Sequence, residues 1–511
     1  MATSDTLVTL YEQAARRHPD AVAFEHGKRS VPYRELLAEV GAVQRLLPAA
    51  AGGRIGLLGS RTLEACLGYL GILRAGAAVV PLDPGFPVER HLAVCRLAGV
   101  TTVLAAGAVE EEALHRYPEA GITVLRTPAP GAAPPPPPPP SPSSADPEAE
   151  AYVLFTSGST GAPKGVPILH RNAVAFLAHL LPHYGLAVGA RVAFTTDLVF
   201  DPSVISLFGA VCSGATAVLP VGRESMLPTH FVRTKRLTHL FSVPSAISRA
   251  VQLRLLVPGA MPSLRWSGFG GEPLTAAQAL SWAAAAPNSR IANLYGPTEL
   301  TVFCAGYDLP SDPAHWPATG NGTLPIGRVH PALDWLLLDP AGRPGTDGEL
   351  CVRGPQRFAG YTDPSADLGR FLRGSSAEGP ERAPEPYDGS TRLTADHWYR
   401  TGDRVRLEGG ELVHVGRIDR QVKIRGYRVE LAEIETALRR VPGVSDVAVV
   451  QVSAAALHAF HTGARHSADE LLGMLRAVLP PYMLPSRLTW LPQLPLNHNG
   501  KTDHHRLAEL D

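Results

Sequence analysis

The sequence has little lysine and no paired cysteine. Only 5 of its 47 basic residues are lysines, so a lysine that remains is expected where a compact point charge is needed. The 47 acidic residues balance the basic ones, and a formal net charge of zero excludes a global field toward nucleic acid or anionic lipid. The 5 cysteines form no CxxC pair and are interpreted as buried thiols of a reducing compartment.

Export and membrane signals are missing as well. The N-terminal residues lack the charged-then-apolar order of a signal peptide. The longest apolar stretch, residues 65–82, is interrupted by Arg74, so no membrane span is expected. These absences favour a cytoplasmic protein with no nucleic-acid partner and no membrane partner.

The chain has 511 residues and 45% apolar content, enough for roughly three folding lobes with large cores. Residues 1–125 alternate helical and strand-like runs, which is the pattern of an α/β fold. Residues 128–150 change to proline and serine and are interpreted as a surface spacer rather than a ligand for a partner. A buried strand over residues 151–155 then leads into a glycine-rich loop, and a helix is expected from Asn172.

The second half divides at about Arg417. Strands and helices alternate before it, apart from a polar excursion over residues 374–394. After Arg417 the pattern indicates a separate small α+β unit with a helix over residues 431–440. In this unit Ser467 and Glu470 form a capping box for a further helix.

The first chemical motif is the glycine-rich loop that follows the buried strand. Its glycines let the backbone curl around an anion, its hydroxyls and amides can donate to phosphate oxygens, and its lysine adds charge. It is not a Walker loop, because Pro163 and Gly165 flank the lysine. A flexible linker is the alternative, but a linker does not normally follow a strand and hold one of so few lysines. The predicted phosphate-binding residues are Thr156, Ser157, Gly158, Ser159, Thr160, Gly161 and Lys164.

Three further motifs contain residue types that suit a nucleotide, although each is ordinary when taken alone. Tyr295, beside a Gly-Pro turn, could stack on a base, and Glu299 could hold Mg²⁺ together with substrate phosphates. Asp403 could accept both ribose hydroxyls, and Arg417 could reach ribose and phosphate. Lys501, ten residues from the C-terminus, could be a mobile cation delivered to the reacting phosphorus.

Taken together, these segments resemble the adenylate-forming superfamily, specifically the adenylation domains of nonribosomal peptide synthetases and the D-alanine–carrier protein ligases. The resemblance covers nearly the whole chain, and the motifs stand in the family order. They are VPYREL (31–36), LRAGAAVVPLDP (73–84), TSGSTGAPKGV (156–166), FDPSV (200–204), GGEPL (270–274), NLYGPTE (293–299), GELCVRG (348–354), YRTGD (399–403), GRIDRQVKIRGYRVE (416–430), LPPYMLPS (479–486) and NGKTD (499–503).

The resemblance implies an α/β fold with two domains. Residues 1–416 would form a large domain of stacked α/β sheets plus a small barrel, which binds ATP and the amino acid. Residues 417–511 would form a small, mobile α+β domain that carries the catalytic lysine. The stretch 451–467 is shorter than usual in the family, which leaves the strand lengths of the small domain open.

The resemblance also implies a role for each matching residue. Besides the phosphate loop, the ATP site would comprise Asn293, Tyr295, Gly296, Asp403 and Arg417. Glu299 would ligate Mg²⁺, and Lys501 would bind the substrate carboxylate and the α-phosphate. Asp419 would be the hinge, and Lys423 would lie on the face that approaches the carrier arm. The residues expected to serve catalysis are Lys501, Glu299, Thr298, Lys423 and Asp419.

The substrate pocket implied by the family contains a single charge. Asp201 stands where family members bind the α-amino group of the substrate; a helix-cap aspartate is the alternative. Leu294 and two phenylalanines suggest a small cavity, although Gly268 and Gly270 could open room on one side. The predicted pocket residues are Phe200, Asp201, Pro202, Ile205, Phe241, Gly268, Gly270, Leu294, Val302 and Phe303. An apolar lining disfavours charged side chains and resembles alanine-activating pockets.

The implied reaction uses ATP and Mg²⁺ to convert a small neutral amino acid to aminoacyl-AMP and then to a thioester. Since no condensation, reductase or carrier-serine motif is present, the phosphopantetheine-bearing carrier protein is expected to be separate. Four alternatives stay open: a D-alanine ligase for cell-wall polymers, a β-amino-acid activator, an acyl- or aryl-CoA ligase, and an inactive carrier-binding module.

Overall fold

The computed structural model describes residues 4–48, 53–128, 146–158, 162–222, 224, 228–374, 384–496 and 502–510. The proline-rich run at 129–145 and residues 375–383 of the polar excursion lie outside the described residues. The same is true of four predicted site residues, Ser159, Thr160, Gly161 and Lys501.

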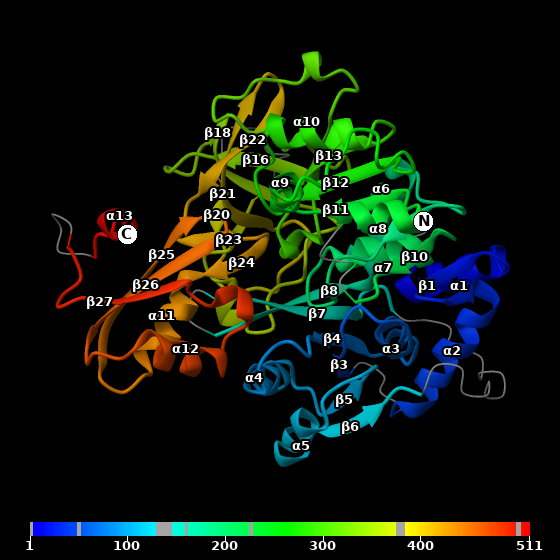
Figure 1. The fold of residues 1–511 in the computed structure, drawn as a ribbon, viewed down its shortest axis with the longest axis horizontal. Helices are drawn as coiled ribbons and strands as arrows, with labels where there is room; N and C mark the ends of the chain where they lie inside the picture. The colour runs from blue at the N-terminus through cyan, green and yellow to red at the C-terminus, as the bar shows by residue number, and fades with distance from the viewer. Residues whose placement is uncertain are drawn as a thin grey trace.

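Two largely parallel sheets form the body of the large domain (Figure 1). The first has the order β15-β14-β13-β12-β11-β9-β10-β1-β2. Its strands are β1 Val22–His26, β2 Arg29–Pro32, β9 Arg191–Ala193, β10 Thr216–Leu219, β11 His239–Ser242, β12 Trp266–Gly270, β13 Arg290–Tyr295, β14 Ala305–Asp308 and β15 Arg328–Val329. The second has the order β6-β5-β3-β4-β7-β8. Its strands are β3 Arg54–Leu58, β4 Ala78–Leu82, β5 Thr102–Ala105, β6 Thr123–Arg126, β7 Glu150–Thr156 and β8 Lys164–Leu169.

Helices share one continuous core with both sheets and also cover their outer faces. The shared core contains α1 Leu7–Arg17, α2 Tyr33–Leu46, α3 Leu63–Arg74, α6 His170–Tyr184 and α7 Ser203–Val211. A second core joins the nine-stranded sheet to α8 Pro228–Lys235, α9 Pro244–Gln252 and α10 Ala276–Ala285. A third joins the six-stranded sheet to α4 Val88–Ala98 and α5 Glu111–Glu119. Because both faces of each sheet are covered, strands such as β4 are buried along their whole length.

A third sheet of the large domain is antiparallel. It contains β16 Asp334–Leu338, β17 Pro344–Gly345, β18 Asp347–Arg353, β19 Phe371–Arg373, β20 Glu385–Pro386, β21 Trp398–Glu408 and β22 Glu411–Arg417. This sheet stands where the sequence predicts a small barrel. Among the described residues its pairings form an open path, with the two-residue strands β17 and β20 at its ends.

The small domain lies beside the large one, in orange and red in Figure 1. It consists of the hairpin β23 Gln421–Ile424 and β24 Tyr427–Glu430, the sheet β25 Val444–Ser453, β26 Ala456–Gly463 and β27 Arg487–Trp490, and the helices α11 Leu431–Arg439, α12 Ala468–Arg476 and α13 His504–Ala508. The sequence pattern predicts no strand over residues 456–463. Strand β26 is buried on both faces, so its sequence shows no alternation of apolar and polar residues that would reveal it.

Local signals in the sequence account for several helix ends. The capping box predicted for Ser467 and Glu470 is present at the start of α12. Thr62 caps α3 by accepting a hydrogen bond from the backbone of Ala65. Helix α6 ends at Gly185, whose φ of 68° lies in the left-handed region that glycine adopts without strain. Helix α6 also covers the helix predicted from Asn172, beginning two residues earlier.

No helix in the described part of the chain is long and apolar enough to cross a membrane. All five cysteines are free, and four of them are buried, as expected for inert thiols.

A buried ion pair joins the two domains and generates the first prediction. Arg90 of α4 donates to Glu433 of α11 at 2.7 Å, and both side chains are less than 7% exposed. Replacing Arg90 with alanine leaves the carboxylate buried without its partner, at a cost of about 3–5 kcal/mol. We expect Arg90→Ala to detach the small domain, which small-angle X-ray scattering will register as a larger radius of gyration. Arg116→Ala removes an exposed pair with Glu89 and is the control; equal scattering from both variants contradicts the prediction.

Candidate active site

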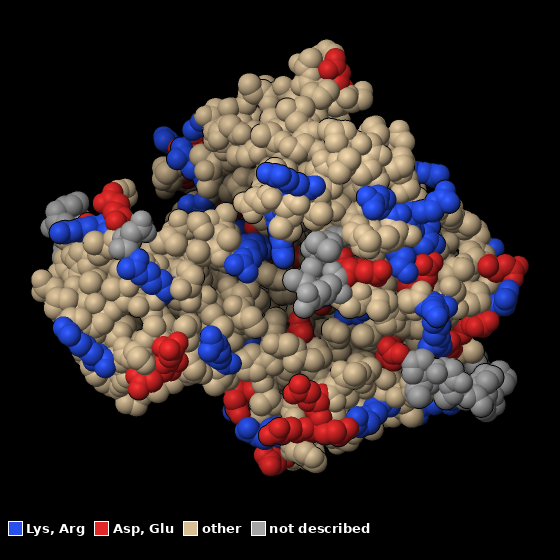
Figure 2. Space-filling view, viewed as in Figure 1, with Lys and Arg blue, Asp and Glu red and all other residues tan. Residues whose placement is uncertain are grey.

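Most predicted site residues meet where the parallel strands of the large domain end. Strand β7 runs into the glycine-rich loop at Ser157, β13 ends at Tyr295, and β12 ends at Gly270. Ligands of open α/β sheets bind outside the carboxyl ends of the strands. The small domain closes over this edge, and Figure 2 shows a hollow between the two domains with Lys and Arg atoms at its rim.

Glu299 is the most deeply buried charge of the site. It is 0% exposed, Tyr361 donates its hydroxyl to Oε1 at 2.8 Å, and Arg428 of the small domain donates to both oxygens at 3.0 and 2.8 Å. Burial alone would raise the pKa of Glu299, but the charge of Arg428 and the hydrogen bond from Tyr361 outweigh it and lower the pKa to about 2. Glu299 is therefore a carboxylate at neutral pH.

Asp403 is a second buried carboxylate that its neighbours keep ionised. Tyr295 donates to Oδ2 at 2.7 Å, while His414 and Arg417 each approach Oδ1 at 3.1 Å. Burial opposes ionisation, but the bond to His414 and the charge of Arg417 hold the pKa of Asp403 well below its ordinary value. His414 escaped the sequence analysis, because only its pairing on β22 beside β21 brings it to Asp403.

The pKa of Asp201 is shifted in the opposite direction to those of Glu299 and Asp403. Burial raises its pKa to about 6, and the hydrogen bond from Thr298 and the charge of Lys423 only partly oppose the rise. Helix α7 begins after Pro202 and takes no side-chain hydrogen bond at its cap, so the alternative of a helix-capping aspartate is not seen. An ionised Asp201 would gain from a cationic ligand.

The hairpin β23–β24 places two cations above this group of acids. The chain turns at Arg425 and Gly426, between the two strands. Lys423 then lies directly opposite Arg428 in the pairing register. Directly opposed residues project to the same face, so both basic side chains reach the cleft. Arg428 was missed as a site residue, although a hairpin assigned to these residues would have identified it as the partner of Lys423.

The glycine-rich loop connects β7 to β8, and Thr156 at the end of β7 pairs with Lys164 at the start of β8. A Cβ at Gly158 would overlap the carbonyl oxygen of Ala162, so this position requires glycine. Ser157 Oγ donates to the carbonyl of Arg428 at 3.0 Å and accepts from the backbone N–H of Glu430 at 3.1 Å. In this pose the hairpin of the small domain therefore occupies the hydroxyl predicted to bind phosphate.

The predicted hinge residue is held in the segment between β22 and β23. Arg417 donates to both oxygens of Asp419 at 2.9 and 2.6 Å and to the carbonyl of Thr401 at 3.0 Å. Arg370 lies 3.9 Å from the same aspartate. Asp419 is thus anchored to the large domain at the point where the chain leaves it for the hairpin.

The predicted adenine side of the site is built on β13. Asn293 is 2% exposed, and its amide nitrogen donates to the carbonyls of Leu324 and Pro325 at 3.1 and 2.7 Å. Gly296 packs so closely that a Cβ there would overlap the backbone of Phe303. Asn293 and Gly296 therefore shape the loops on either side of Tyr295.

The predicted substrate pocket is an apolar region beside Asp201. Phe241 on β11, Gly268 and Gly270 on β12 and Leu294 on β13 stand on neighbouring strands, and Phe303 follows the turn after them. Ile205, Leu294, Val302 and Phe303 are each at most 5% exposed. Together with Phe241 they belong to the same buried hydrophobic core.

Trp266 occupies the room that Gly268 was expected to open. A Cβ at Gly268 would overlap the Trp266 ring and come 2.8 Å from the Cδ1 of Leu294. The Trp266 ring also packs on Tyr184, with 4.4 Å between the centroids. Residues two apart on a strand share a face, so Trp266 could have been recognised from its position before Gly268.

The turn at Thr301 and Val302 is strained. Their φ angles of 59° and 73° are left-handed, which is unusual for β-branched residues and costs of order 1–2 kcal/mol per residue. Gln356 stabilises the turn by donating to the carbonyls of Leu300 and Phe303 at 3.1 and 3.0 Å. The strain is located where Val302 and Phe303 enter the predicted pocket.

Phe200, also predicted to line the pocket, lies in the interface between the domains. Its ring centroid is 4.8 Å from that of Tyr427 and 6.1 Å from that of Tyr482, both in the small domain. Tyr482 also meets Phe86 of the large domain at 5.9 Å. These four rings form an aromatic contact that supports the pose of the small domain.

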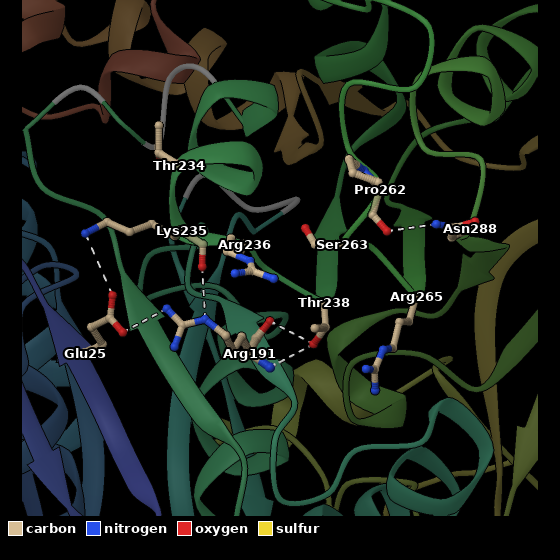
Figure 3. Close-up of a pocket in the computed structure, with 10 residues that line it drawn as sticks. All are labelled: Glu25, Arg191, Thr234, Lys235, Arg236, Thr238, Pro262, Ser263, Arg265 and Asn288. Atoms are coloured by element: carbon tan, nitrogen blue, oxygen red, sulfur yellow. Dashed lines mark hydrogen bonds and ion pairs between the residues drawn. The ribbon is translucent and has the colours of Figure 1, made fainter.

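A surface pocket of about 770 Å³ lies elsewhere, at the opposite end of the same strands (Figure 3). Arg191, Thr238 and Arg265, which line it, stand at the start of β9, β11 and β12 or just before it. Glu25 pairs with Arg191 at 2.8 Å and with Lys235 at 3.9 Å. Because this pocket faces the amino ends of the strands and contains none of the motif residues, it is not the adenylation site.

Comparison with known proteins identifies the class. The AMP-binding enzyme family matches residues 11–362, and the AMP-binding enzyme C-terminal domain matches residues 433–501. The chain belongs to the AMP-binding enzyme family and is an adenylate-forming ligase that uses ATP. It is an adenylation domain of the nonribosomal peptide synthetase type.

Individual relatives agree with this assignment. The AMB antimetabolite synthetase AmbB of Pseudomonas aeruginosa is 34% identical over 513 residues, and the match covers 98% of this chain and 38% of that protein. The chain thus spans less than half the length of this curated relative. The Vibrio cholerae adenylation domain AlmE, solved with glycyl-adenosine-5'-phosphate, is 26% identical with a TM-score of 0.80, covering 98% of this chain and 97% of AlmE. PA1221, a protein with adenylation and PCP domains, is 25% identical with a TM-score of 0.81, covering 99% of this chain and 84% of PA1221.

The tight contact at Gly296 generates the second prediction. In Gly296→Ala the new methyl group meets backbone rather than a flexible side chain, so the loop must shift. We expect a loss of about 1–3 kcal/mol in the free energy of unfolding, measured by urea denaturation. Gly345→Ala, where a methyl group meets open space, is the control and is expected to change stability by less than about 0.5 kcal/mol. Equal stability of the two variants would refute this packing argument.

Proposed function

We propose that the protein activates a small neutral amino acid as aminoacyl-AMP and passes the acyl group to the phosphopantetheine thiol of a carrier protein. The observation that carries the proposal is Asp201, a half-buried acid that precedes the apolar helix α7 and lies next to the ATP-side residues Thr298 and Glu299. A carboxylate in such surroundings favours a ligand with one ammonium group and no other charge.

The chemistry follows from this arrangement. A carboxylate oxygen of the amino acid attacks the α-phosphorus of ATP, pyrophosphate leaves, and an acyl-phosphate anhydride forms. A thiol then attacks the acyl carbon, AMP leaves with one of the original carboxylate oxygens, and a thioester remains. Carboxylates are weak nucleophiles, so the protein contributes mainly positioning and neutralisation of charge on phosphorus. We assign to Lys501 the positive charge that neutralises the α-phosphate during the first step.

Magnesium fits the donor set of the site. Glu299 is a fully buried, ionised carboxylate, and hard oxygen ligands of this kind are the ones that Mg²⁺ binds together with substrate phosphates. When bound, the ion would neutralise charge on the phosphates. Tyr361 keeps Glu299 oriented through its hydrogen bond at 2.8 Å.

The pocket favours a small side chain. Trp266 fills the space beside Gly268, and Leu294, Val302 and Phe303 are packed against each other in the same core. AlmE, which shares the fold over its whole length, was solved with a glycyl adenylate. We therefore place alanine first and glycine second among the candidate substrates.

A carrier protein is the expected acceptor. PA1221 contains a PCP domain in addition to its adenylation domain. In the present chain Lys423 lies on the hairpin that covers the site, near Asp403 and Asp201, where an incoming thiol would meet the adenylate. We propose that this pose of the small domain is the one that serves thioester formation, with Asp419 as the hinge.

The direct test is pyrophosphate exchange with all proteinogenic amino acids, D-alanine, β-amino acids and aryl acids. We expect alanine or glycine to support the fastest exchange. Asp201→Ala should lower kcat/KM for the amino acid by about 10²-fold or more, because the ammonium loses its charged partner. Asp396→Ala, at an exposed site, is the control. Preference for an aryl acid, lysine or glutamate would overturn the substrate assignment, and D-alanine or a β-amino acid would select one of the close alternatives.

A change at Trp266 tests the size limit separately. Trp266→Ala removes the ring beside Gly268, so longer side chains gain space. A methylene is worth about 1–3 kcal/mol in an apolar pocket, and we expect the ratio of leucine to alanine activation to rise at least about 10-fold. The measurement is again pyrophosphate exchange, with leucine and alanine assayed on the same protein preparation. An unchanged ratio would show that the ring does not limit the pocket.

A further inference from the structure

Arg428 reaches out of the small domain to the carboxylate that was assigned to the metal. Its guanidinium contacts both oxygens of Glu299, at 3.0 and 2.8 Å, and its side chain is 14% exposed against 0% for the glutamate. Tyr361 donates to Oε1 as well. In this arrangement of the domains both oxygens of the carboxylate are engaged and arginine balances its charge, so a second cation has no access to it.

The same hairpin also occupies a phosphate ligand. Ser157 Oγ donates to the carbonyl of Arg428 and accepts from the N–H of Glu430, at 3.0 and 3.1 Å. Two groups that the ATP-bound enzyme needs, the Ser157 hydroxyl and the Glu299 carboxylate, are therefore held by one two-stranded element of the small domain. Neither contact can form while a metal and a phosphate tail are bound to these groups.

Arg428 has capacity for one more contact. Its Nε is buried, and within the described residues it has no hydrogen-bond partner. A buried guanidinium nitrogen without an acceptor is costly unless a ligand supplies one. An oxygen of the adenylate would be such an acceptor, and it would be present at the stage when pyrophosphate has left.

We propose that Arg428 replaces the metal ion on Glu299 after the first half-reaction, so that the hairpin can dock only when the metal and pyrophosphate have gone. The inference rests on the proposed function and adds an ordering device to it. The cation changes from a diffusible ion to a tethered guanidinium, and the buried carboxylate keeps a positive partner in both states. Arg428 acts through Glu299 and the hairpin, as a positioning residue for thioester formation.

Binding of Mn²⁺ to the free protein tests the competition without any turnover. Electron paramagnetic resonance measures free Mn²⁺ during a titration of the wild type, Arg428→Gln, Arg428→Lys and the double variant Arg428→Gln/Glu299→Gln. We expect Arg428→Gln to bind Mn²⁺ at least about 3-fold more tightly than the wild type, since Glu299 becomes accessible. Arg428→Lys keeps the charge and should bind Mn²⁺ as the wild type does. The double variant should lose the increase in Mn²⁺ affinity, because Glu299 is no longer a carboxylate. Equal affinity in wild type and Arg428→Gln would overturn the proposal.

The second readout compares the two half-reactions on the same preparation. In Arg428→Gln the rate of acyl transfer from presynthesised alanyl-AMP to a thiol should fall by about 10-fold or more, relative to the pyrophosphate-exchange rate of the same variant. Arg428→Lys should restore part of the lost transfer rate. Arg476→Ala, at an exposed arginine of α12, is the control. A parallel loss in both half-reactions would contradict the ordering role. Absence of exchange with every amino acid would instead defeat the proposed function, while the Mn²⁺ titration would still decide on the competition.

Discussion

The contact between Glu299 and Arg428 is the constraint on which the arrangement of this protein depends. A carboxylate with no solvent exposure is stable as an anion only when a cation meets it, and here that cation comes from the other domain. The small domain must lie close to the large one to supply Arg428. This proximity also brings the hairpin to Ser157 and allows the aromatic contact around Phe200. The buried pair of Arg90 and Glu433 holds a second point of the same interface.

The cleft contains three acids with different electrostatic surroundings. Asp403 and Glu299 have arginines and hydroxyl donors beside them, so the pKa of each lies below its ordinary value. Asp201 has one hydroxyl donor and a more distant lysine, and burial raises its pKa to about 6. Within the described residues the first two carboxylates each form an ion pair with an arginine, whereas no ion pair is seen for Asp201. We propose the ammonium group of the amino acid as the partner of Asp201.

The sequence predicted much of the fold because its signals are local. The strand before the glycine-rich loop, the helix from Asn172 and the capping box at Ser467 each depend on a few adjacent residues and are confirmed. Strand β26 was missed because burial on both faces removes the alternation that marks a strand. The candidate site was predictable only where the motif residues themselves come together in the cleft, as at Glu299. Contacts that depend on tertiary pairing were not visible: His414 approaches Asp403 across β21 and β22, and Arg428 reaches Glu299 from another domain.

The most direct test of adenylate formation follows the carboxylate oxygen. The protein is incubated with ATP, hydroxylamine as acceptor, and alanine labelled with ¹⁸O in both carboxylate oxygens, and the released AMP is analysed by mass spectrometry. If the carboxylate attacks the α-phosphorus and the acyl group then leaves, each AMP will carry one ¹⁸O and pyrophosphate will carry none. Unlabelled AMP, or label in inorganic phosphate formed together with ADP, would contradict adenylate formation at this site.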